Sequence, residues 1–574
     1  MAILSKWGEQ LNEKKPLQEY PRMQLQRDSY TNLNGVWEYQ ITDGDASPVS
    51  SLWKKIIVPF SPGSKLSGTD EILLPGKTLW YRKQFAYQPV SKQTWLRFEA
   101  VDQCCTVYMN GIEVGSHEGG YCPFGFDVSG MIKYQNSLMV KVTDDSDQGR
   151  FAYGKQKIEH SGMWYTPCSG IWQTVWLEDM SEHAVHDLKI TPDCEKNTVY
   201  FDLAGDFSQA AITISDGKGI VHRGLTIDRH YAAPIEHPHY WTPDDPFLYD
   251  VYIQTEDDIV KSYFGMRRFS IANDASGLKR FCLNDEPLFL SGLLDQGYTV
   301  DGGMTFPDDD AMVYELRKIR EMGFNMLRKH VKVECRRWYY HCDRLGILVM
   351  QDMPSGGRYD FKTMTLWPTL GFNKDDTKAD LGRSEAVEKQ IYYAELDAML
   401  DELYNAPCIF AWCPFNEGWG QFASARVTEH IRRYDSTRLI DSASGWFDQG
   451  AGDFRSIHDY FFPYRTKPDK KGRAVLLSEF GGYSYIEWGH CEAGELYGYK
   501  KFTDKLEMDN AIAALYEKIV LRNIPLGLAG CIYTQVSDIE DECNGLFTAD
   551  RKIIKIDIKR MRRINDRCRR KLKQ

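Results

Sequence analysis

The sequence predicts a multidomain fold in which two all-β sandwiches precede a (β/α)8 barrel. Its 574 residues correspond to about three or four domains, at roughly 100–200 residues each. Short strand-like runs separated by turn residues fill the chain up to residue 274, and from about residue 275 such runs alternate with helices. The predicted domains are therefore residues 1–180, 181–274 and 275–574.

The first two domains are predicted from strand patterns. Residues 78–85, 94–100 and 106–111 alternate between apolar and polar side chains, and Asn110-Gly111 is a strong signal for a tight turn. These features are typical of an all-β sandwich. The same pattern continues between residues 181 and 274, a length that suits an immunoglobulin-like sandwich of about 100 residues.

The third domain is predicted from strands that alternate with helices. A helical period with an acidic first turn runs from Asp308 to Met322. The predicted barrel strands are residues 288–291, 325–328, 346–350, 408–412, 438–441, 456–459, 475–478 and 530–534. Eight such runs indicate a (β/α)8 barrel. A doubly wound sheet is the alternative, but no Gly-x-Gly-x-x-Gly motif follows the first run.

Composition excludes several classes of protein. No apolar run approaches the roughly 18 residues that cross a bilayer, so an integral membrane protein is not expected. The net charge of -11 argues against general binding of nucleic acid. Fourteen scattered cysteines lack zinc-type spacing, and the N-terminus lacks a secretory pattern, so we expect a reduced, cytoplasmic location. The aromatic content of 13% fits either sugar stacking or large β-rich cores.

The C-terminal segment differs in charge from the rest of the chain. Residues 555–574 carry ten Lys or Arg against two Asp. The apolar residues of this segment recur at helical spacing, at Met561, Ile564, Cys568 and Leu572. We therefore predict a terminal amphipathic helix with a solvated basic face in preference to a functional basic tail.

Two predicted barrel strands end in a glutamate after a long apolar run. Ile409 to Glu417 contains the fourth strand, and Val475 to Glu479 contains the seventh. Catalytic residues of such barrels lie at the carboxyl ends of the strands, and a buried carboxylate is costly unless it is paired or used. Two facing carboxylates suit glycoside hydrolysis, with a separation of about 5–5.5 Å for retention and roughly 6.5–9.5 Å for inversion. Glu417 and Glu479 are the predicted catalytic pair.

These motifs, in this order, resemble glycoside hydrolase family 2, which contains β-galactosidases, β-glucuronidases and β-mannosidases. The resemblance covers nearly the whole chain and implies a jelly-roll sugar-binding domain, an immunoglobulin-like domain and a TIM barrel. Asn416-Glu417-Gly418 and Ser478-Glu479-Phe480-Gly481 resemble the two catalytic motifs of the family. The other matching segments are residues 20–28, 33–37, 169–178, 264–269 and 283–292.

The resemblance implies a retaining mechanism with a role for each residue. It makes Glu417 the acid/base and Glu479 the nucleophile, and it makes Asn416 a ligand of the sugar 2-hydroxyl. By the same resemblance, His330 lines the glycone pocket. Tyr460, at the end of the sixth strand, is expected to orient Glu479.

Departures from the family pattern concern the sugar. Leu293 to Tyr298 replaces the usual His-Glu, which makes Asp295 a candidate sugar ligand. Trp164 occupies the position of a common sugar-binding Asp, and Tyr533 matches a Trp of the eighth strand. The glucuronidase clamp Asn-x-Lys has no lysine here, because Asn544-Gly-Leu546 replaces it, which counts against an anionic glycone.

No metal and no organic cofactor are expected. Residues 351–357, which match the magnesium-binding segment of some galactosidases, offer one carboxylate. Residues 354–381 form a long loop that we predict to be a lid on the aglycone side, with Trp367 as a stacking platform. Trp446 and Trp488 are similar candidates on later loops.

The sequence thus predicts a retaining exo-β-glycosidase that acts on a glycoside or oligosaccharide, with β-galactosidase as the default class. Other glycones remain open: galactofuranose, an arabinose-type pentose, glucuronate or mannose. A carbohydrate-binding protein without catalysis is the alternative from another class, and a structural barrel in a larger assembly is a third. A homo-oligomer also remains open, because sandwich domains can form subunit contacts.

Overall fold

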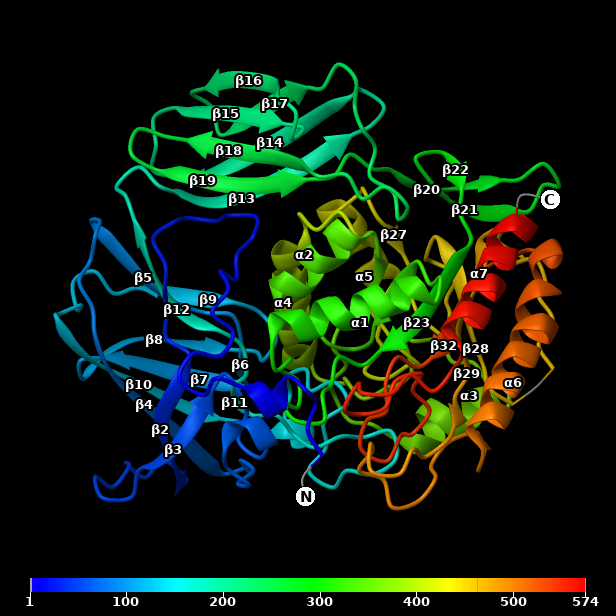
Figure 1. Ribbon diagram of the computed structural model, residues 1–574, viewed down its shortest axis with the longest axis horizontal. Helices are drawn as coiled ribbons and strands as arrows, with labels where there is room; N and C mark the ends of the chain where they lie inside the picture. Colours follow the sequence, from blue (N-terminus) through cyan, green and yellow to red (C-terminus); the bar gives the residue numbers. More distant parts are fainter. Residues whose placement is uncertain (1–2, 462, 573–574) are drawn as a thin grey trace.

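The computed structural model describes residues 3–461 and 463–572. Figure 1 shows a large β-sandwich from the first part of the chain, a smaller sandwich beside it, and a barrel surrounded by helices. This is the predicted fold class, two antiparallel sandwiches followed by a parallel eight-stranded barrel.

The N-terminal sandwich consists of two antiparallel sheets packed face to face. The strands of the six-stranded sheet are, in order, β3 (Lys54–Val58), β2 (Gly35–Asp43), β4 (Lys77–Ala86), β10 (Gln135–Thr143), β7 (Cys104–Met109) and β8 (Ile112–Glu118). Those of the four-stranded sheet are β1 (Thr31–Asn32), β12 (Val175–Met180), β5 (Gln93–Phe98) and β9 (Phe124–Asp127). Alternate residues of the facing strands, such as Trp37, Tyr81 and Leu96, fill the core between the sheets.

The second sandwich is smaller and has the same plan. Its three-stranded sheet contains β13 (Val185–Asp193), β14 (Thr198–Gly205) and β17 (His230–Pro234). Its four-stranded sheet contains β16 (Ile220–Thr226), β15 (Ala210–Ser215), β18 (Tyr249–Gln254) and β19 (Ile259–Phe264). A short sheet of β20 (Phe269–Asn273), β21 (Lys279–Leu283) and β22 (Glu286–Pro287) then leads into the barrel.

All eight predicted barrel strands are present. They are β23 (Leu290–Asp295), β24 (Met326–Lys329), β25 (Leu348–Asp352), β26 (Ile409–Cys413), β27 (Leu439–Ile440), β28 (Phe454–Asp459), β29 (Ala474–Gly481) and β32 (Leu528–Thr534). The strands are parallel, and β23 pairs with both β24 and β32, so the first strand lies next to the last. Their carboxyl ends therefore meet at one mouth.

Helices surround the barrel strands. They are α1 (Asp309–Glu321), α2 (Arg336–Leu345), α4 (Ala386–Leu403), α5 (Ser424–Tyr434), α6 (Lys505–Leu515) and α7 (Ile558–Leu572), while the short α3 (Trp367–Thr369) lies in the 354–381 loop. The acidic start predicted for the first helix is present, and Asp308 caps it by accepting from Asp310 N. Among the described helices, none is both long and apolar enough to span a membrane.

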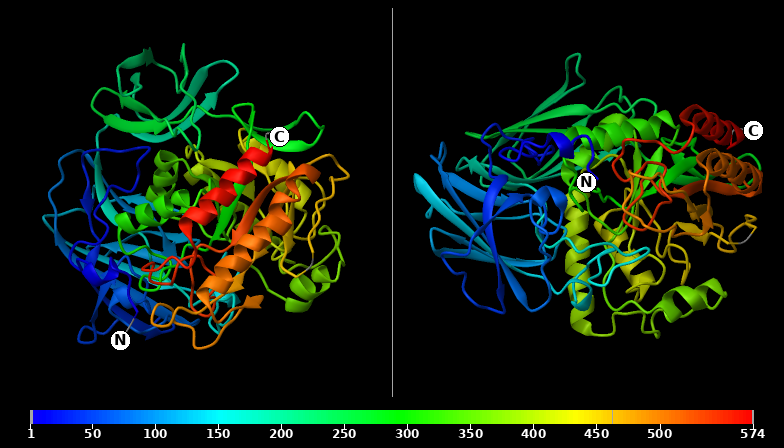
Figure 2. Two further views of the ribbon diagram at one scale, coloured as in Figure 1. Left: turned by 45° about the vertical axis from the view of Figure 1, so that its right-hand side comes forward. Right: turned by 60° about the horizontal axis from the view of Figure 1, so that its bottom comes forward.

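The basic terminal segment forms α7, which packs against the barrel beside α6 (Figures 1 and 2). The four apolar residues predicted to form its buried face are buried. Asn565 on the same face accepts from Ser291 Oγ and donates to Met322 O, which joins the helix to the barrel. Arg567 pairs with Glu517 at the surface. This arrangement is the predicted amphipathic helix.

A loop of the N-terminal sandwich, residues 152–168, reaches the barrel mouth. Tyr165 OH donates to Glu542, while the Gly162 and Thr166 amides donate to Asp541 at 2.9 Å and to Glu540 at 2.8 Å. The three acceptors follow β32, the last barrel strand. The sandwich therefore closes one side of the mouth, a position that sequence spacing does not reveal.

Candidate active site

Glu417 follows β26 on a turn whose backbone is fixed on both sides. Its φ of +53° lies in the left-handed region, which costs a non-glycine residue about 1–3 kcal/mol. The Glu417 amide donates to Ser444 O at 2.9 Å, and Trp446 Nε1 donates to the Glu417 carbonyl at 3.1 Å. The side chain is 23% exposed. The turn therefore holds a partly accessible carboxylate at the barrel mouth.

Glu479 lies within β29 and is buried. Its Oε1 accepts from Arg328 Nη1 at 3.0 Å and its Oε2 from Tyr460 OH at 2.7 Å, as expected of a tyrosine that orients it. Burial by itself would raise the pKa of Glu479, but His458 and Arg328 outweigh it and lower that pKa to about 2. Glu479 is therefore ionised at neutral pH, as a nucleophile must be.

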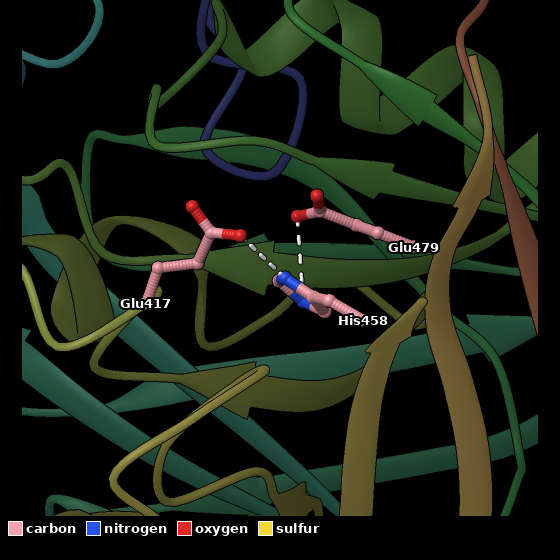
Figure 3. Close-up of side chains that lie close together, drawn as sticks. All are labelled: Glu417, His458 and Glu479. Carbon is pink, nitrogen blue, oxygen red and sulfur yellow. Dashed lines mark hydrogen bonds and ion pairs between the residues drawn. The ribbon is translucent and has the colours of Figure 1, made fainter. Parts of the chain in front are cut away.

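His458, near the end of β28, lies between the two glutamates (Figure 3). Its Nδ1 is 2.7 Å from Glu417 Oε1, and its Nε2 is 3.4 Å from Glu479 Oε1. One nitrogen of the ring and one oxygen of each carboxylate lie within 4.8 Å of one another. An oxygen–oxygen distance of at most 4.8 Å suits the roughly 5–5.5 Å between the carboxyl groups of retaining glycosidases better than the roughly 6.5–9.5 Å of inverting ones.

Arg328 connects these groups and is a site residue that the motifs did not indicate. It is fully buried in β24 and contacts both oxygens of Asp352 at 3.0 Å. It also donates to Glu479 and, at 2.8 Å, to Asn416 Oδ1. A signal was present in the sequence, because an arginine inside an apolar barrel strand needs buried anionic partners.

The site does not suit a divalent cation. Glu417, His458 and Glu479 are close enough together to bind one, but the Arg328 guanidinium already lies 3.0 Å from Glu479 Oε1 and would repel it. Asp352, the one carboxylate of the 351–357 segment, is engaged by Arg328 and by His330. The expectation that catalysis needs no metal therefore stays a prediction, which this arrangement of charges favours.

Asn416 and His330 each have one polar atom that no hydrogen bond engages among the described residues. Because Arg328 can only donate, Asn416 Oδ1 is its acceptor, which leaves the amide Nδ2 to donate to a substrate. His330 Nδ1 lies 2.8 Å from Asp352 Oδ2, so the ring donates there and presents Nε2 as an acceptor. Burial lowers the pKa of His330 and keeps its ring neutral.

Two predicted sugar ligands lie elsewhere. Asp295 accepts from Lys329 Nζ at 2.7 Å and from the Gly297 amide at 2.9 Å, so both of its oxygens are engaged in a buried ion-pair group. Tyr533 is also buried, and it packs edge-on against Phe480 on the outer side of the strands.

Tyr533 does not border the barrel mouth as predicted, because its side chain lies on the outer face of β32. Side chains alternate along a strand, so the next residue, Thr534, faces the interior. Its Oγ1 lies 2.8 Å from Tyr460 OH, the hydroxyl that also donates to the Glu479 carboxylate.

The predicted tryptophans occupy three different settings. Trp164 is buried beside Tyr359 and Trp419, with ring centroids 4.9 and 5.0 Å away. Trp446 is half-buried, and its indole N–H also donates to Met364 O at 2.8 Å, which ties the 354–381 segment to the Glu417 turn. Trp367 and Trp488 are 46% and 72% exposed. Both therefore lie at the protein surface.

An open cleft of about 910 Å³ extends outward from Trp164. Tyr359, Phe361 and Tyr497 line it together with Trp164. Burial, and to a smaller degree the nearby charge of Glu417, raise the pKa of Tyr359 to about 12, so this wall lies within the field of Glu417.

Lys155 and Glu542 are two further charged residues at the mouth that the motifs did not indicate. Lys155 is 9% exposed, on the sandwich loop beside Trp164, and among the described residues no hydrogen bond or ion pair engages its Nζ. Glu542 is buried and accepts from Tyr165 OH. Burial raises the pKa of Glu542, and among the smaller effects Lys155 lowers it while Glu479 raises it. Lys155 and Glu479 therefore act in opposite directions on the charge of Glu542.

Family models match part of the N-terminal sandwich and part of the barrel. Residues 69–173 match the family model described as "Glycosyl hydrolase 2 galactose-binding domain-like". Residues 276–475 match the one described as "Glycosyl hydrolases family 2, TIM barrel domain".

Among curated proteins, a β-galactosidase of Thermoanaerobacter pseudethanolicus is 27% identical over 412 residues, which are 66% of this chain and 49% of that protein. A putative β-glucuronidase of Formosa agariphila is 25% identical over 450 residues, 72% of this chain and 40% of that protein. The chain thus spans about half the length of the curated relatives it matches.

Similar solved structures match over their whole length. The β-D-glucuronidase of Dictyoglomus thermophilum gives a TM-score of 0.73 at 17% identity, covering 96% of this chain and 98% of that one. A β-glucuronidase of an uncultured Clostridium gives a TM-score of 0.74 at 18% identity, covering 95% and 99%. At this identity the likeness establishes the fold alone.

Proposed function

Because this chain belongs to glycoside hydrolase family 2, we propose that it is a retaining exo-β-glycosidase that releases a neutral, galactose-like sugar. The observation that carries the proposal is the pair of carboxylates at the ends of β26 and β29, with oxygens within 4.8 Å of each other. The sandwich loop that closes one side of the mouth supports exo action, since it favours a pocket over an open groove.

The two carboxylates take different roles because their surroundings differ. Glu479, ionised by its cationic neighbours, attacks the anomeric carbon while Glu417 gives a proton to the leaving oxygen. Water then attacks the glycosyl–enzyme bond, and Glu417 takes the proton of that water. Asn416 Nδ2 and His330 Nε2, which no hydrogen bond engages in the described part of the chain, can contact sugar hydroxyls near the nucleophile.

The charge of the pocket favours a neutral glycone. Glu542 follows β32 and is near enough to Glu479 for each charge to disfavour the other. A uronate carboxylate there would face two anions, and the Asn544-Gly-Leu546 segment supplies no lysine to oppose them. A sugar hydroxyl, in contrast, can donate to Glu542.

β-Glucuronidase is the second candidate, and Lys155 is the observation that favours it. Lys155 is only 9% exposed, and among the described residues no hydrogen bond or ion pair balances the charge of its ammonium group, so a substrate carboxylate would be a favourable partner. In the galactosidase-like function a sugar hydroxyl would lie beside Lys155, and in the β-glucuronidase function a sugar carboxylate would lie there.

A panel of 4-nitrophenyl glycosides tests the proposed function. We expect turnover of a β-galactoside, β-galactofuranoside or arabinose-type substrate, with the β-anomer formed first in the NMR spectrum of the product. Turnover restricted to the β-glucuronide would select the second candidate. An α-anomer as the first product would mean that the mechanism is inverting. If no glycoside is cleaved, the proposal that the protein is a glycosidase is contradicted.

Replacing Lys155 by methionine measures what this side chain contributes. We expect kcat/KM for the preferred neutral glycoside to fall roughly 10- to 100-fold, because a hydrogen bond to a charged group contributes about 1.5–3 kcal/mol. Lys157→Met is the matched control, since Lys157 lies on the same loop but over the rings of Trp164 and Tyr359 in the outer cleft. Equal losses in the two variants would deny Lys155 a specific contact with the glycone.

A further inference from the structure

His458 contacts Glu417, the acid/base of the proposed mechanism, but has no role in that mechanism so far. Its side chain is fully buried, and its two ring nitrogens face different groups. Nδ1 faces Glu417 Oε1 at 2.7 Å, as Figure 3 shows. Nε2 faces Ser444 Oγ at 3.1 Å and Arg328 Nη1 at 3.3 Å. The ring is therefore held between the acid/base and the arginine that supports the nucleophile.

These neighbours determine where the ring proton lies. A neutral imidazole has one donor nitrogen and one acceptor nitrogen. Arg328 has only donors, so the Nε2 that faces it acts as the acceptor, and Nδ1 carries the hydrogen. When the ring is protonated, the state in which it lowers the pKa of Glu479, Nδ1 keeps its hydrogen and the second hydrogen is on Nε2, 3.4 Å from Glu479 Oε1. In both states Nδ1–H donates to Glu417.

The two oxygens of Glu417 are consequently not equivalent. Oε1 always receives a hydrogen from His458, so it cannot also carry the proton on that side. Among the described residues, no hydrogen bond engages Oε2, and the side chain is 23% exposed. An acid proton on Glu417 therefore belongs on Oε2.

We propose that His458 is a positioning residue that keeps the transferable proton of Glu417 on Oε2, the oxygen that faces the leaving group. This inference rests on the proposed function, in which Glu417 is the acid/base. His458 touches neither the sugar nor the leaving group, and it acts through the carboxylate that does.

The proton balance of both half-reactions agrees with this role. In the first, the Oε2–H bond breaks as the glycosidic oxygen gains the hydrogen, and the anomeric carbon exchanges that oxygen for one of Glu479. In the second, a water O–H bond breaks toward Oε2 while the water oxygen displaces Glu479. Nδ1–H of His458 is retained throughout and stabilises the Glu417 charge between the two steps.

Three substitutions at His458 separate this role from simple packing. His458→Asn places an amide nitrogen near the position of Nδ1, because both atoms are bonded to Cγ. His458→Gln places its nitrogen near Nε2 instead, and His458→Ala removes both. Each variant is assayed with the phenyl and the 2,4-dinitrophenyl β-glycoside of a sugar that the wild-type enzyme cleaves.

The expected result is a loss that depends on the leaving group. Phenoxide leaves poorly and needs the proton, so kcat/KM for the phenyl glycoside falls by roughly 10²-fold in His458→Ala and His458→Gln. Dinitrophenoxide leaves without protonation, so the same variants lose less than about threefold with that substrate. His458→Asn recovers most of the phenyl activity because its N–H replaces Nδ1–H.

Other outcomes would overturn the inference in distinguishable ways. Equal losses with both leaving groups would make His458 a structural residue, and so would a failure of His458→Asn to exceed His458→Gln. Thermal unfolding of each variant shows whether a loss of activity reflects a loss of folded protein. If it does, the ratio of kcat/KM for the two substrates still separates the two roles, because this ratio does not depend on how much of the protein is folded. Failure of the wild-type enzyme to cleave either substrate would instead contradict the proposed function.

Discussion

Turnover should fall by at least about 10⁴-fold when Glu479 is replaced by alanine, because the variant has no group to form the glycosyl–enzyme bond. Stability should change little by comparison. The substitution removes a buried carboxylate that Arg328 and Tyr460 contact, but Arg328 keeps Asp352 as its counterion. The measurement is kcat/KM with an activated aryl glycoside, alongside thermal unfolding of the same preparation.

Added azide makes this prediction specific to the nucleophile. In Glu479→Ala the small anion can enter the vacated space and displace the leaving group directly, which gives the α-glycosyl azide. In Glu417→Ala the covalent intermediate still forms from an activated substrate, and azide then gives the β-glycosyl azide. NMR of the two products assigns the two roles.

The outcome that would contradict the assignment is equally clear. If the α-azide came from Glu417→Ala and the β-azide from Glu479→Ala, the roles would be reversed. Activity in Glu479→Ala within tenfold of wild type would place the nucleophile elsewhere.

The second large effect is expected at Arg328. Replacing it by methionine leaves Asp352 and Glu479 buried without their shared cation, and breaking a buried ion pair costs about 3–5 kcal/mol. Arg328 is also one of the groups that lower the pKa of Glu479, so that pKa should rise in the variant. The acid limb of the kcat/KM profile should then move to higher pH.

The sign of the pH effect on stability follows from the same shift. A carboxylate whose pKa is depressed in the folded state stabilises the fold above its unfolded pKa, and the contribution is lost as pH falls toward the folded value. The difference in unfolding free energy between wild type and Arg328→Met should therefore shrink as pH falls below about 4, where the unfolded glutamate gains its proton.

Arg438→Met is the matched control. Arg438 is also buried and paired, with Asp435 at 2.9 Å, but it donates to the carbonyls of Tyr404 and Ala406 at the opposite end of the barrel. It should lose comparable stability while its pH profile stays that of the wild type. A shifted profile in Arg438→Met, or an unshifted one in Arg328→Met, would separate Arg328 from the ionisation of Glu479.

Much of the fold could be predicted from local patterns. The eight barrel strands coincide with apolar runs between turn residues, and α1 begins at an acidic turn that caps it. The burial of Met561 and Cys568 in α7 follows from their helical spacing. These features depend on neighbours in the sequence, which is why periodicity reveals them.

The candidate site was only partly predictable. Glu417 and Glu479 could be found because each ends an apolar strand, and parallel strands of a barrel end on the same side. Tyr533 shows the limit of this reasoning. Side chains at successive positions of β32 point to opposite faces of the barrel wall. Motif matching placed Tyr533 at the mouth, but the side chain that faces the interior is that of Thr534.

The sequence by itself determined the order of the three domains, the barrel and the two glutamates at its mouth, because each depends on local period and composition. Only the tertiary structure decided which cations and hydrogen-bond donors surround those glutamates. Arg328 and His458 come from β24 and β28 and contact each other, while Lys155 comes from a loop of another domain and acts on the charge of Glu542. Charges interact through space and not along the chain, so their partners emerge only when distant segments are folded together.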